Sequence, residues 1–171
     1  SYDDFIRTSA DPRHRPAVEE IWRRCVAGGD LYRGSYTGWY CNGCEEFRDA
    51  DDDGGRCAEH DRPLERIDED NWFFRLSRYR EAVADLVTAG RLRIEPEARR
   101  NEVLGFLAGD IRDVSVSRSV ARARGWGIGV PGDADQVIYV WFDALANYVA
   151  SLGFPDDAPR VRRYWHEASR R

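Results

Sequence analysis

Two short pairs of metal-ligand residues constrain this chain more than any other feature. The first pair lies in Cys41-Asn42-Gly43-Cys44, and the second lies in Cys57-Ala58-Glu59-His60, after twelve intervening residues. Two residues inside each pair let a tight turn present both side chains to one ion at roughly 2.0 to 2.3 Å. Cys41, Cys44, Cys57 and His60 fill a tetrahedral site with no position left for water, which predicts one structural zinc ion. The alternative is a disulfide between two of these cysteines, with His60 uninvolved.

The fourth cysteine, Cys25, falls on a helical stripe with Val18, Ile21 and Trp22, and we expect it to be a buried thiol. An unmatched thiol beside a metal-ligand set favours a reducing, cytoplasmic compartment. No apolar run approaches the roughly 18 residues of a membrane helix, and Ser1 opens no secretory signal. We therefore expect a cytoplasmic location and no membrane partner.

The charge of the chain limits its partners. Its 26 basic residues are all arginine, because the sequence contains no lysine, and the formal net charge is -5. This balance argues against a protein that coats nucleic acid by bulk electrostatic attraction. Arg118, Arg122 and Arg124 are close enough in sequence to form a local basic patch.

The first half of the chain alternates between the two kinds of secondary structure. Residues 5–8 resemble a short strand, and residues 15–27 have the apolar spacing of a helix that Gly28 and Gly29 end. Residues 31–40 are rich in aromatic side chains and predict a strand that leads to Cys41. Residues 51–55 predict a polar hairpin tip between the two ligand pairs.

Strands and helices continue after His60. Residues 62–70 predict an exposed strand or hairpin. Residues 71–76 predict a buried strand, although a ligand surface is an alternative for this apolar stretch. Ser77 is the expected N-cap of a helix that reaches Ala89, and a further helix is expected between Pro96 and Gly109.

The last third of the chain again predicts strands alternating with helices. Residues 113–118 alternate as a strand does, and residues 137–141 form the continuous apolar run of a strand covered on both faces, as in a parallel sheet. Helices are expected over residues 142–152 and 159–169. A strand that passes directly into a helix would place the intervening residues at a ligand-binding sheet edge.

This order predicts an α/β fold interrupted by an inserted domain. Residues 1–30 and 118–171 form the two flanks of the interrupted fold, and residues 31–117 form the zinc-bearing insert.

Several motifs, in order and spacing, resemble methionyl-tRNA synthetase and its paralogues over nearly the whole chain. The matching segments are Phe5-Ile6-Arg7-Thr8 with Asp11-Pro12-Arg13-His14; Gly29-Asp30-Leu31-Tyr32; Tyr36-Thr37-Gly38-Trp39-Tyr40-Cys41 with Cys44-Glu45; Cys57-Ala58-Glu59-His60; Asn71-Trp72-Phe73-Phe74-Arg75-Leu76-Ser77; Arg100-Asn101-Glu102-Val103; Asp113-Val114-Ser115-Val116-Ser117-Arg118; Trp126-Gly127-Ile128; and Tyr139-Val140-Trp141-Phe142-Asp143-Ala144-Leu145. The resemblance implies a class I Rossmann domain in which the insert is a connective peptide with a single zinc knuckle.

The resemblance also implies roles for individual residues. Trp141, Ala144, Leu145 and Tyr148 match the positions that form the methionine side-chain pocket in this family, and Arg118 matches an arginine that links the insert to the catalytic domain near the tRNA acceptor end. Aromatic walls and a small alanine suit an apolar, polarizable thioether. Without the resemblance, Trp141 and Tyr148 would be assigned to an ordinary core.

The chain also departs from the family pattern. Class I chemistry with ATP and Mg²⁺ needs a His-x-Gly-His element and a lysine-containing loop to stabilise charge, and this sequence has neither. We therefore expect a middle portion that does not activate an amino acid alone and that needs the remaining parts of the catalytic domain. The loop between Ser117 and Trp126 also shows an apparent one-residue expansion.

Three functions fit these residues. The first is the central portion of an ATP-dependent aminoacyl-tRNA ligase for protein biosynthesis, with methionine favoured. The second is a synthetase-like domain that joins an amino acid to a hydroxylamine acceptor in hydrazine-forming enzymes, together with a cupin domain. The third is a non-catalytic zinc module that binds RNA or a protein.

Overall fold

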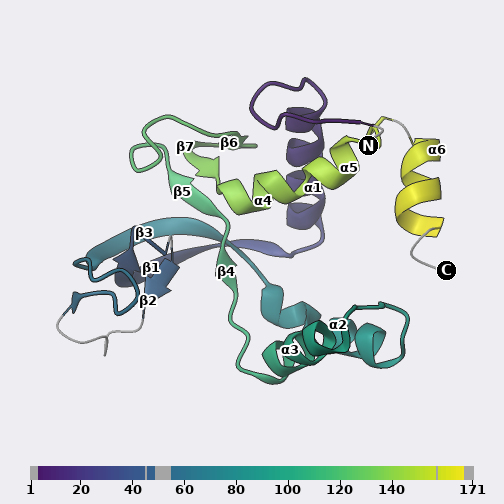
Figure 1. The fold of residues 1–171 in the computed structure, drawn as a ribbon. Helices are drawn as coiled ribbons and strands as arrows, with labels where there is room; N and C mark the ends of the chain where they lie inside the picture. Colours follow the sequence, from purple (N-terminus) through teal and green to yellow (C-terminus); the bar gives the residue numbers. More distant parts are fainter. Residues whose placement is uncertain (1–3, 45, 49–54, 157, 168–171) are drawn as a thin grey trace.

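The computed structural model describes residues 4–44, 46–48, 55–156 and 158–167. It is a mixed α/β structure with two antiparallel sheets, a group of helices against the smaller sheet, and a helical hairpin beyond the larger one (Figure 1). The expected hairpin tip at residues 51–55 lies outside the described residues except for Gly55. The terminal Arg170 and Arg171 also lie outside them.

The larger sheet has the strand order β2-β1-β3-β4. Its strands are β1 (Leu31–Cys41), β2 (Glu46–Arg48), β3 (Glu65–Phe74) and β4 (Val114–Ser115). β3 joins the exposed and buried strands expected at residues 62–70 and 71–76 into one, because it pairs with β1 along nearly its whole length, from Leu31 opposite Phe74 to Tyr40 opposite Glu65.

The smaller sheet has the order β5-β7-β6, with β5 (Ser117–Ser119), β6 (Gly129–Val130) and β7 (Asp133–Ile138). β7 is antiparallel to both neighbours, so the expectation of a parallel strand over residues 137–141 is wrong. The apolar run is shared between two elements: β7 ends at Ile138, and Tyr139 is the N-cap of helix α4 (Val140–Leu145). An apolar run this short does not distinguish a buried strand from a buried helix.

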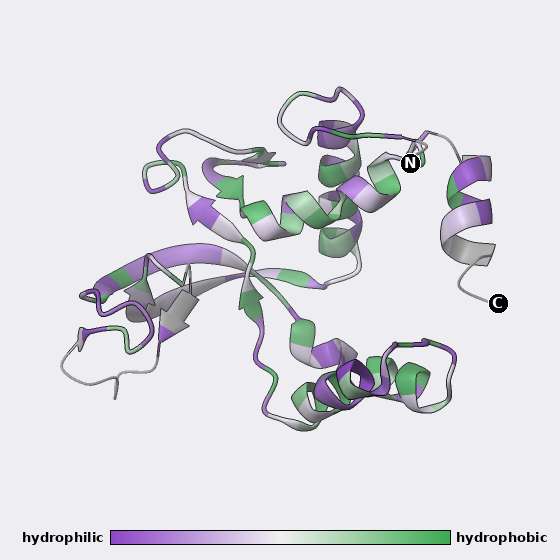
Figure 2. Ribbon diagram, in the orientation of Figure 1, coloured by the Kyte–Doolittle hydropathy of each residue, from purple (hydrophilic) through white to green (hydrophobic). Residues whose placement is uncertain are grey.

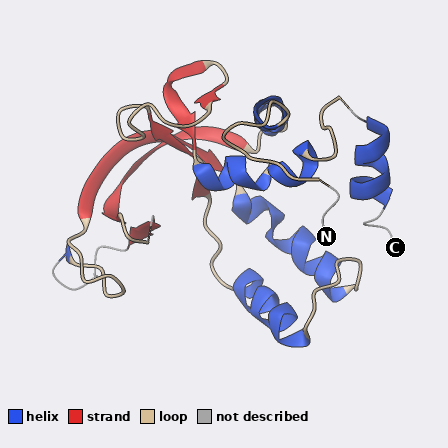
Figure 3. Cartoon of the chain, turned by 45° about the horizontal axis from the view of Figure 1, so that its top comes forward, coloured by secondary structure: helices blue, strands red, loops and turns tan. Residues whose placement is uncertain are grey.

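The helices fall into three groups. Helix α1 (His14–Ala27) packs with α4 and with α5 (Asn147–Ala150), as Figure 1 shows. The hairpin contains the 3-10 turn η2 (Leu76–Tyr79), α2 (Arg80–Thr88) and α3 (Glu97–Ala108), and Pro96 and Gly109 cap α3 as expected. The last segment is α6 (Ala158–Val161), followed by the π-helical turn η3 (Arg162–Glu167). Figure 3 shows that the strands gather at one side of the molecule and the helices at the other.

Three other local expectations differ from the structure. Residues 5–8 form no strand, and a turn begins at Thr8, because no described strand lies beside them. Ser77 does not cap a helix. It lies inside η2, and its hydroxyl donates to Asp113 at 2.6 Å, a partner 36 positions away that local sequence cannot reveal. The strand expected over residues 113–118 is split between β4 in one sheet and β5 in the other.

The main core joins both ends of the chain. Its buried members are Val18, Trp22, Leu31, Val116, Val130, Ile138 and Ala146. Trp22 lies at its centre and makes edge contacts with Trp72 and Phe142, with ring centroids 5.8 and 5.3 Å apart. Figure 2 shows the hydrophobic colour on α1 and α4, whereas the far part of β3 is hydrophilic. A second, small core contains Cys41, Cys57 and Leu64, with Cys44 against it.

Candidate metal centre and amino-acid pocket

The four ligand residues found in the sequence converge in space. One donor atom from each of Cys41, Cys44, Cys57 and His60 lies within 4.8 Å of all the others. Cys44 Sγ is 3.5 Å from Cys57 Sγ and 3.2 Å from His60 Nδ1, and Cys57 Sγ is 3.9 Å from His60 Nδ1. A tetrahedron with metal–sulfur bonds of about 2.3 Å has edges of about 3.8 Å, so this donor set fits one zinc ion. The cysteines are free thiols, and the disulfide alternative is not observed.

Two turns bring these ligands together. β1 delivers Cys41 at its last residue, and the backbone N–H of Cys44 points back to Cys41 Sγ at 3.4 Å. Gly43 permits the approach of the second turn, because a Cβ at this position would lie 2.7 Å from Cγ of His60. The second turn is closed by two backbone hydrogen bonds, in which the N–H of Asp61 donates to the Cys57 carbonyl at 2.8 Å and the N–H of Cys57 donates to the Arg62 carbonyl at 2.8 Å. Glycine at position 43 therefore allows the imidazole to reach the site.

The surroundings favour the thiolate at two of the three sulfur atoms, whereas at Cys44 the lowering effect of Arg48 is outweighed by burial and by the neighbouring Cys57 and Cys41, which raise the pKa of Cys44 to about 12. The N–H of Cys44 lowers the pKa of Cys41 to about 7, and the hydrogen bond with His60 lowers the pKa of Cys57. Arg48 Nη2 donates to Cys44 Sγ at 2.8 Å and to Glu59 at 2.9 Å. Three thiolates would leave a Zn²⁺ site with one net negative charge, which the guanidinium of Arg48 can offset.

The residues expected in the amino-acid pocket share one helical face. Trp141, Leu145 and Tyr148 are 63%, 62% and 60% exposed, and Ala144 lies half-buried beside them. Their spacing of four and three residues places the three large side chains on one stripe of α4 and α5. Trp141 and Tyr148 are therefore not core aromatics in this structure.

Arg118 and Arg122 do not form the open basic patch that their sequence spacing allowed. Arg118 is buried, with its guanidinium carbon 4.1 Å from the centroid of the Tyr139 ring, and it donates to the Ser117 carbonyl at 2.8 Å. Arg122 stacks on Tyr40 and pairs with Glu69 at 3.1 Å. Only Arg124 of the three is exposed. Stacking and ion pairing turn the other two toward the protein.

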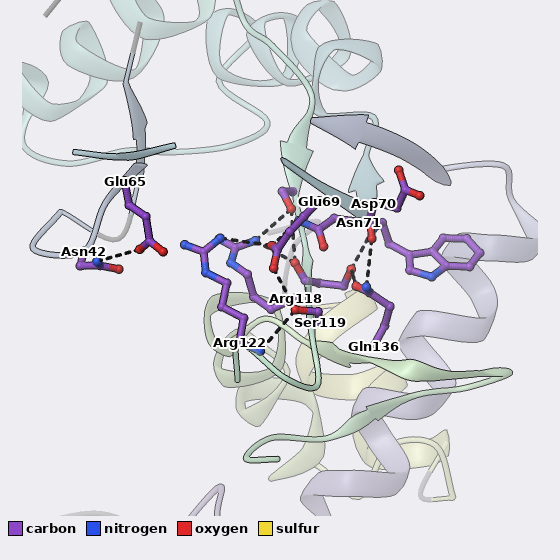
Figure 4. Close-up of polar contacts among 12 residues, drawn as sticks. Asn42, Glu65, Glu69, Asp70, Asn71, Arg118, Ser119, Arg122 and Gln136 are labelled. Atoms are coloured by element: carbon purple, nitrogen blue, oxygen red, sulfur yellow. Dashed lines mark hydrogen bonds and ion pairs between the residues drawn. The ribbon is translucent and has the colours of Figure 1, made fainter. Parts of the chain in front are cut away.

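A polar seam between the two sheets was missed by sequence reasoning. Ser117 Oγ accepts the N–H of Trp72 at 2.8 Å and donates to Gln136, whose amide reaches the Asp70 carbonyl at 2.9 Å. Ser119 donates to Glu69 at 2.8 Å. Figure 4 shows four residues of this seam, Glu69, Asp70, Ser119 and Gln136, gathered together. No sequence signal marks them, because the partners lie 19 to 66 positions apart.

A second missed contact is buried behind α4. His14 Nε2 and Asp143 Oδ1 are 3.4 Å apart, and both residues are buried. Burial raises the pKa of Asp143, while the contact with His14 opposes that shift. The sequence distance of 129 residues again hides the pair.

Comparison with known proteins identifies the family. The family model described as tRNA synthetases class I (M) matches residues 1–63 and 53–171.

The chain belongs to this family. The methionine–tRNA ligase of Brucella suis is 41% identical over 170 residues, covering 96% of the chain and 32% of the relative. That of Thermosynechococcus vestitus is 45% identical over 163 residues, covering 94% of the chain and 30% of the relative. The chain thus spans about a third of the length of these relatives, and they lend no support to a hydrazine-forming enzyme or a stand-alone zinc module.

A solved structure of this family has the same fold. The methionyl-tRNA synthetase of Mycobacterium tuberculosis bound by methionyl-adenylate superimposes with a TM-score of 0.82 at 42% identity, over 96% of this chain and 33% of that one. This confirms the expected fold class, a portion of a class I synthetase. Among the described residues, no helix is long and apolar enough to cross a membrane.

Proposed function

We propose that the protein acts as a methionyl-tRNA synthetase, to which these 171 residues contribute the zinc-bearing insert and part of the amino-acid pocket. In this reaction the methionine carboxylate attacks the α-phosphorus of ATP, pyrophosphate leaves, and a 3′-terminal hydroxyl of the tRNA then takes the acyl group from the adenylate, with AMP as the leaving group. The observation that best supports the proposal is the 0.82 TM-score and 42% identity with a synthetase that holds methionyl-adenylate. ATP and Mg²⁺ would be bound with parts of the catalytic domain beyond this chain, and the cytoplasm is the proposed location.

The pocket assignment follows from α4 and α5. Trp141, Ala144, Leu145 and Tyr148 present apolar and aromatic surface on one stripe, which suits the thioether side chain of methionine. A contiguous exposed apolar patch is typical of an interaction surface or a ligand-binding groove. We assign these four residues to the wall of the amino-acid site.

The metal site is assigned a structural role. Cys41, Cys44, Cys57 and His60 supply four donors, which complete a tetrahedral zinc ion and leave no place for a reacting water. When bound, zinc would supply folding free energy to the insert, which has only a small core at this end. We also propose that the chain is divided into the two flanks of the interrupted fold, residues 1–30 and 118–171, and the zinc-bearing insert, residues 31–117.

Arg118 is assigned a linking role between the insert and the catalytic domain. It stacks on Tyr139, which caps α4, and it donates to Ser115 of β4 at 2.9 Å. The same side chain therefore contacts the larger sheet and the start of the pocket helix. We propose that this contact keeps the insert in place near the tRNA acceptor end.

The test is amino-acid-dependent exchange of pyrophosphate into ATP by the full-length protein, with each of the twenty amino acids. We expect exchange with methionine, and we expect Trp141→Ala to raise the KM for methionine by about tenfold. Trp126→Ala is the matched control, because Trp126 is equally exposed, at 65%, but lies outside α4 and α5. Exchange with another amino acid and none with methionine would refute the proposal. The 171-residue chain alone, which lacks lysine and a His-x-Gly-His element, is expected to show no exchange.

A further inference from the structure

The buried pair His14 and Asp143 lies directly behind the proposed amino-acid pocket. His14, the first residue of α1, is 0% exposed, and Asp143, in the first turn of α4, is 7% exposed. The ionisable groups near His14 are Asp143, on α4, and Asp11, on the turn before α1. The carboxylate of Asp11 pairs with Arg13 at 2.8 Å.

The helix that carries Asp143 has two distinct faces. Trp141, Leu145 and Tyr148 face outward. The opposite stripe, directed to α1, contains Asp143 and then Ala146 and Ala150, which are buried. Ala146 and Ala150 offer only small methyl groups, so the rotation of this segment about its axis is set by the two larger contacts of α4 with α1, which are the Phe142 ring against Trp22 and the 3.4 Å contact between His14 and Asp143. Ring packing tolerates small rotations, whereas a hydrogen bond depends on direction, so the polar contact adds a directional restraint to the packing.

Stability alone does not explain this pair. Two buried ionisable side chains lose their hydration, and replacing such a pair by apolar residues of similar volume is often neutral or stabilising. His14 Nδ1 also has no hydrogen-bond partner among the described residues, which adds to the cost of keeping a histidine here. Trp22 and Phe142 already supply an apolar contact between α1 and α4, with ring centroids 5.3 Å apart.

We propose that His14 and Asp143 are positioning residues that set the rotation of α4 and thereby the direction in which Trp141 and Leu145 line the amino-acid site. This inference rests on the proposed function, because that function identifies methionine as the ligand. The contact between His14 and Asp143 does not depend on the proposed function. Neither residue is assigned contact with the substrate.

The decisive variant replaces both residues together in the full-length protein. His14→Leu with Asp143→Leu replaces both ionisable side chains by apolar ones of comparable shape and removes the directional bond, so we expect thermal stability close to wild type. The KM for methionine should rise by about tenfold, while kcat and the KM for ATP change by less than about threefold. Arg15→Ala is the control, because Arg15 adjoins His14 on α1 but is exposed and pairs only with Glu19 among the described residues. A folded double variant with an unchanged KM for methionine would overturn the proposal.

A second readout does not depend on activity. In protein labelled with 5-fluorotryptophan, the fluorine resonance of Trp141, assigned by its loss in Trp141→Phe, should shift or broaden in the double variant. The resonance of Trp126 should stay unchanged. If the wild-type protein fails to exchange pyrophosphate with methionine, the proposed function is wrong, and the fluorine spectrum still decides the role of the pair. An unchanged Trp141 resonance would show that the pair does not position α4.

The conservative variant His14→Gln covers the case in which the double variant does not fold. Its side-chain amide can still donate to Asp143, although with a shorter reach. We expect its KM for methionine to lie between those of wild type and the single variant His14→Leu. A KM for His14→Gln equal to that of His14→Leu would contradict a role for the hydrogen bond.

Discussion

The guanidinium carbon of Arg122 lies 4.1 Å from the centroid of the Tyr40 ring, and Tyr40 immediately precedes the metal-ligand residue Cys41. The same arginine pairs with Glu69 of β3 at 3.1 Å, and both side chains of this pair are largely shielded from water. Arg122 therefore connects the strand that enters the metal centre with the loop that follows β5. Through Glu69, Arg122 adjoins the polar seam between the two sheets, and Arg118 lies beside the same seam (Figure 4).

Arg122→Ala should lower the free energy of unfolding by about 1 to 3 kcal/mol, because it removes a shielded ion pair and a cation–π contact together. Arg124→Ala, in the same loop but exposed, should change it by less than about 0.5 kcal/mol. Denaturant unfolding monitored by circular dichroism measures both values. Equal losses of unfolding free energy in the two variants would mean that the contacts of Arg122 do not stabilise the protein.

Gly43→Ala should weaken zinc binding, because the added Cβ would meet the His60 ring at 2.7 Å and displace a ligand. Competition with a chromogenic chelator gives the zinc affinity. The matched control is Gly105→Ala, since no atom lies within 4 Å of a Cβ at Gly105 and the residue sits inside α3. That control should bind zinc normally and be neutral or stabilised by about 0.5 to 1 kcal/mol. Normal zinc affinity in Gly43→Ala would contradict the packing of the two turns.

Arg48→Ala should lower zinc affinity by roughly 10- to 100-fold, the usual effect of removing a group that hydrogen-bonds a metal ligand. The reason is the 2.8 Å contact between Arg48 and Cys44 Sγ. Arg56→Ala is the comparison, because Arg56 pairs with Asp61 at 2.9 Å close to the same site but has no described contact with a sulfur atom. The rate of zinc transfer to a chelator should rise only in Arg48→Ala. Similar rates in the two variants would exclude a role for Arg48 at the sulfur.

Trp22→Ala should destabilise the protein by about 3 to 5 kcal/mol, because it empties the centre of the main core. Trp22 is fully buried between Trp72 and Phe142. Trp126→Ala removes an equally large but exposed side chain and should have little effect on thermal unfolding. A small loss of stability in Trp22→Ala would contradict the assignment of Trp22 to the centre of the main core.

The sequence was sufficient where function or local chemistry dictates residue type. Doublet spacing identified Cys41, Cys44, Cys57 and His60 before their geometry was known, and the structure brings all four together. Proline and glycine similarly marked the ends of α3 at Pro96 and Gly109. In each case the signal lies within a few residues of the feature that it predicts.

The sequence was insufficient where the structure depends on distant partners. The direction of β7 follows from its pairing with β5 and β6, which the apolar run at residues 137–141 does not encode. Ser77 was expected to cap a helix and instead binds Asp113. His14 and Asp143 carried no sign of their contact. Such residues become recognisable only when the tertiary fold places them together.

The most direct test of the account is the zinc content of the purified protein by elemental analysis, measured together with that of Cys57→Ser. The four converging donors predict one zinc ion per chain, bound with roughly 10 to 16 kcal/mol of apparent free energy near neutral pH. Acid should release the ion, because protons compete for the thiolates and the imidazole. Cys57→Ser should lose the zinc and the protection of β1 and β2 from hydrogen exchange, while α1 stays protected. A protein without zinc, or a Cys57→Ser variant with an intact insert, would contradict the account.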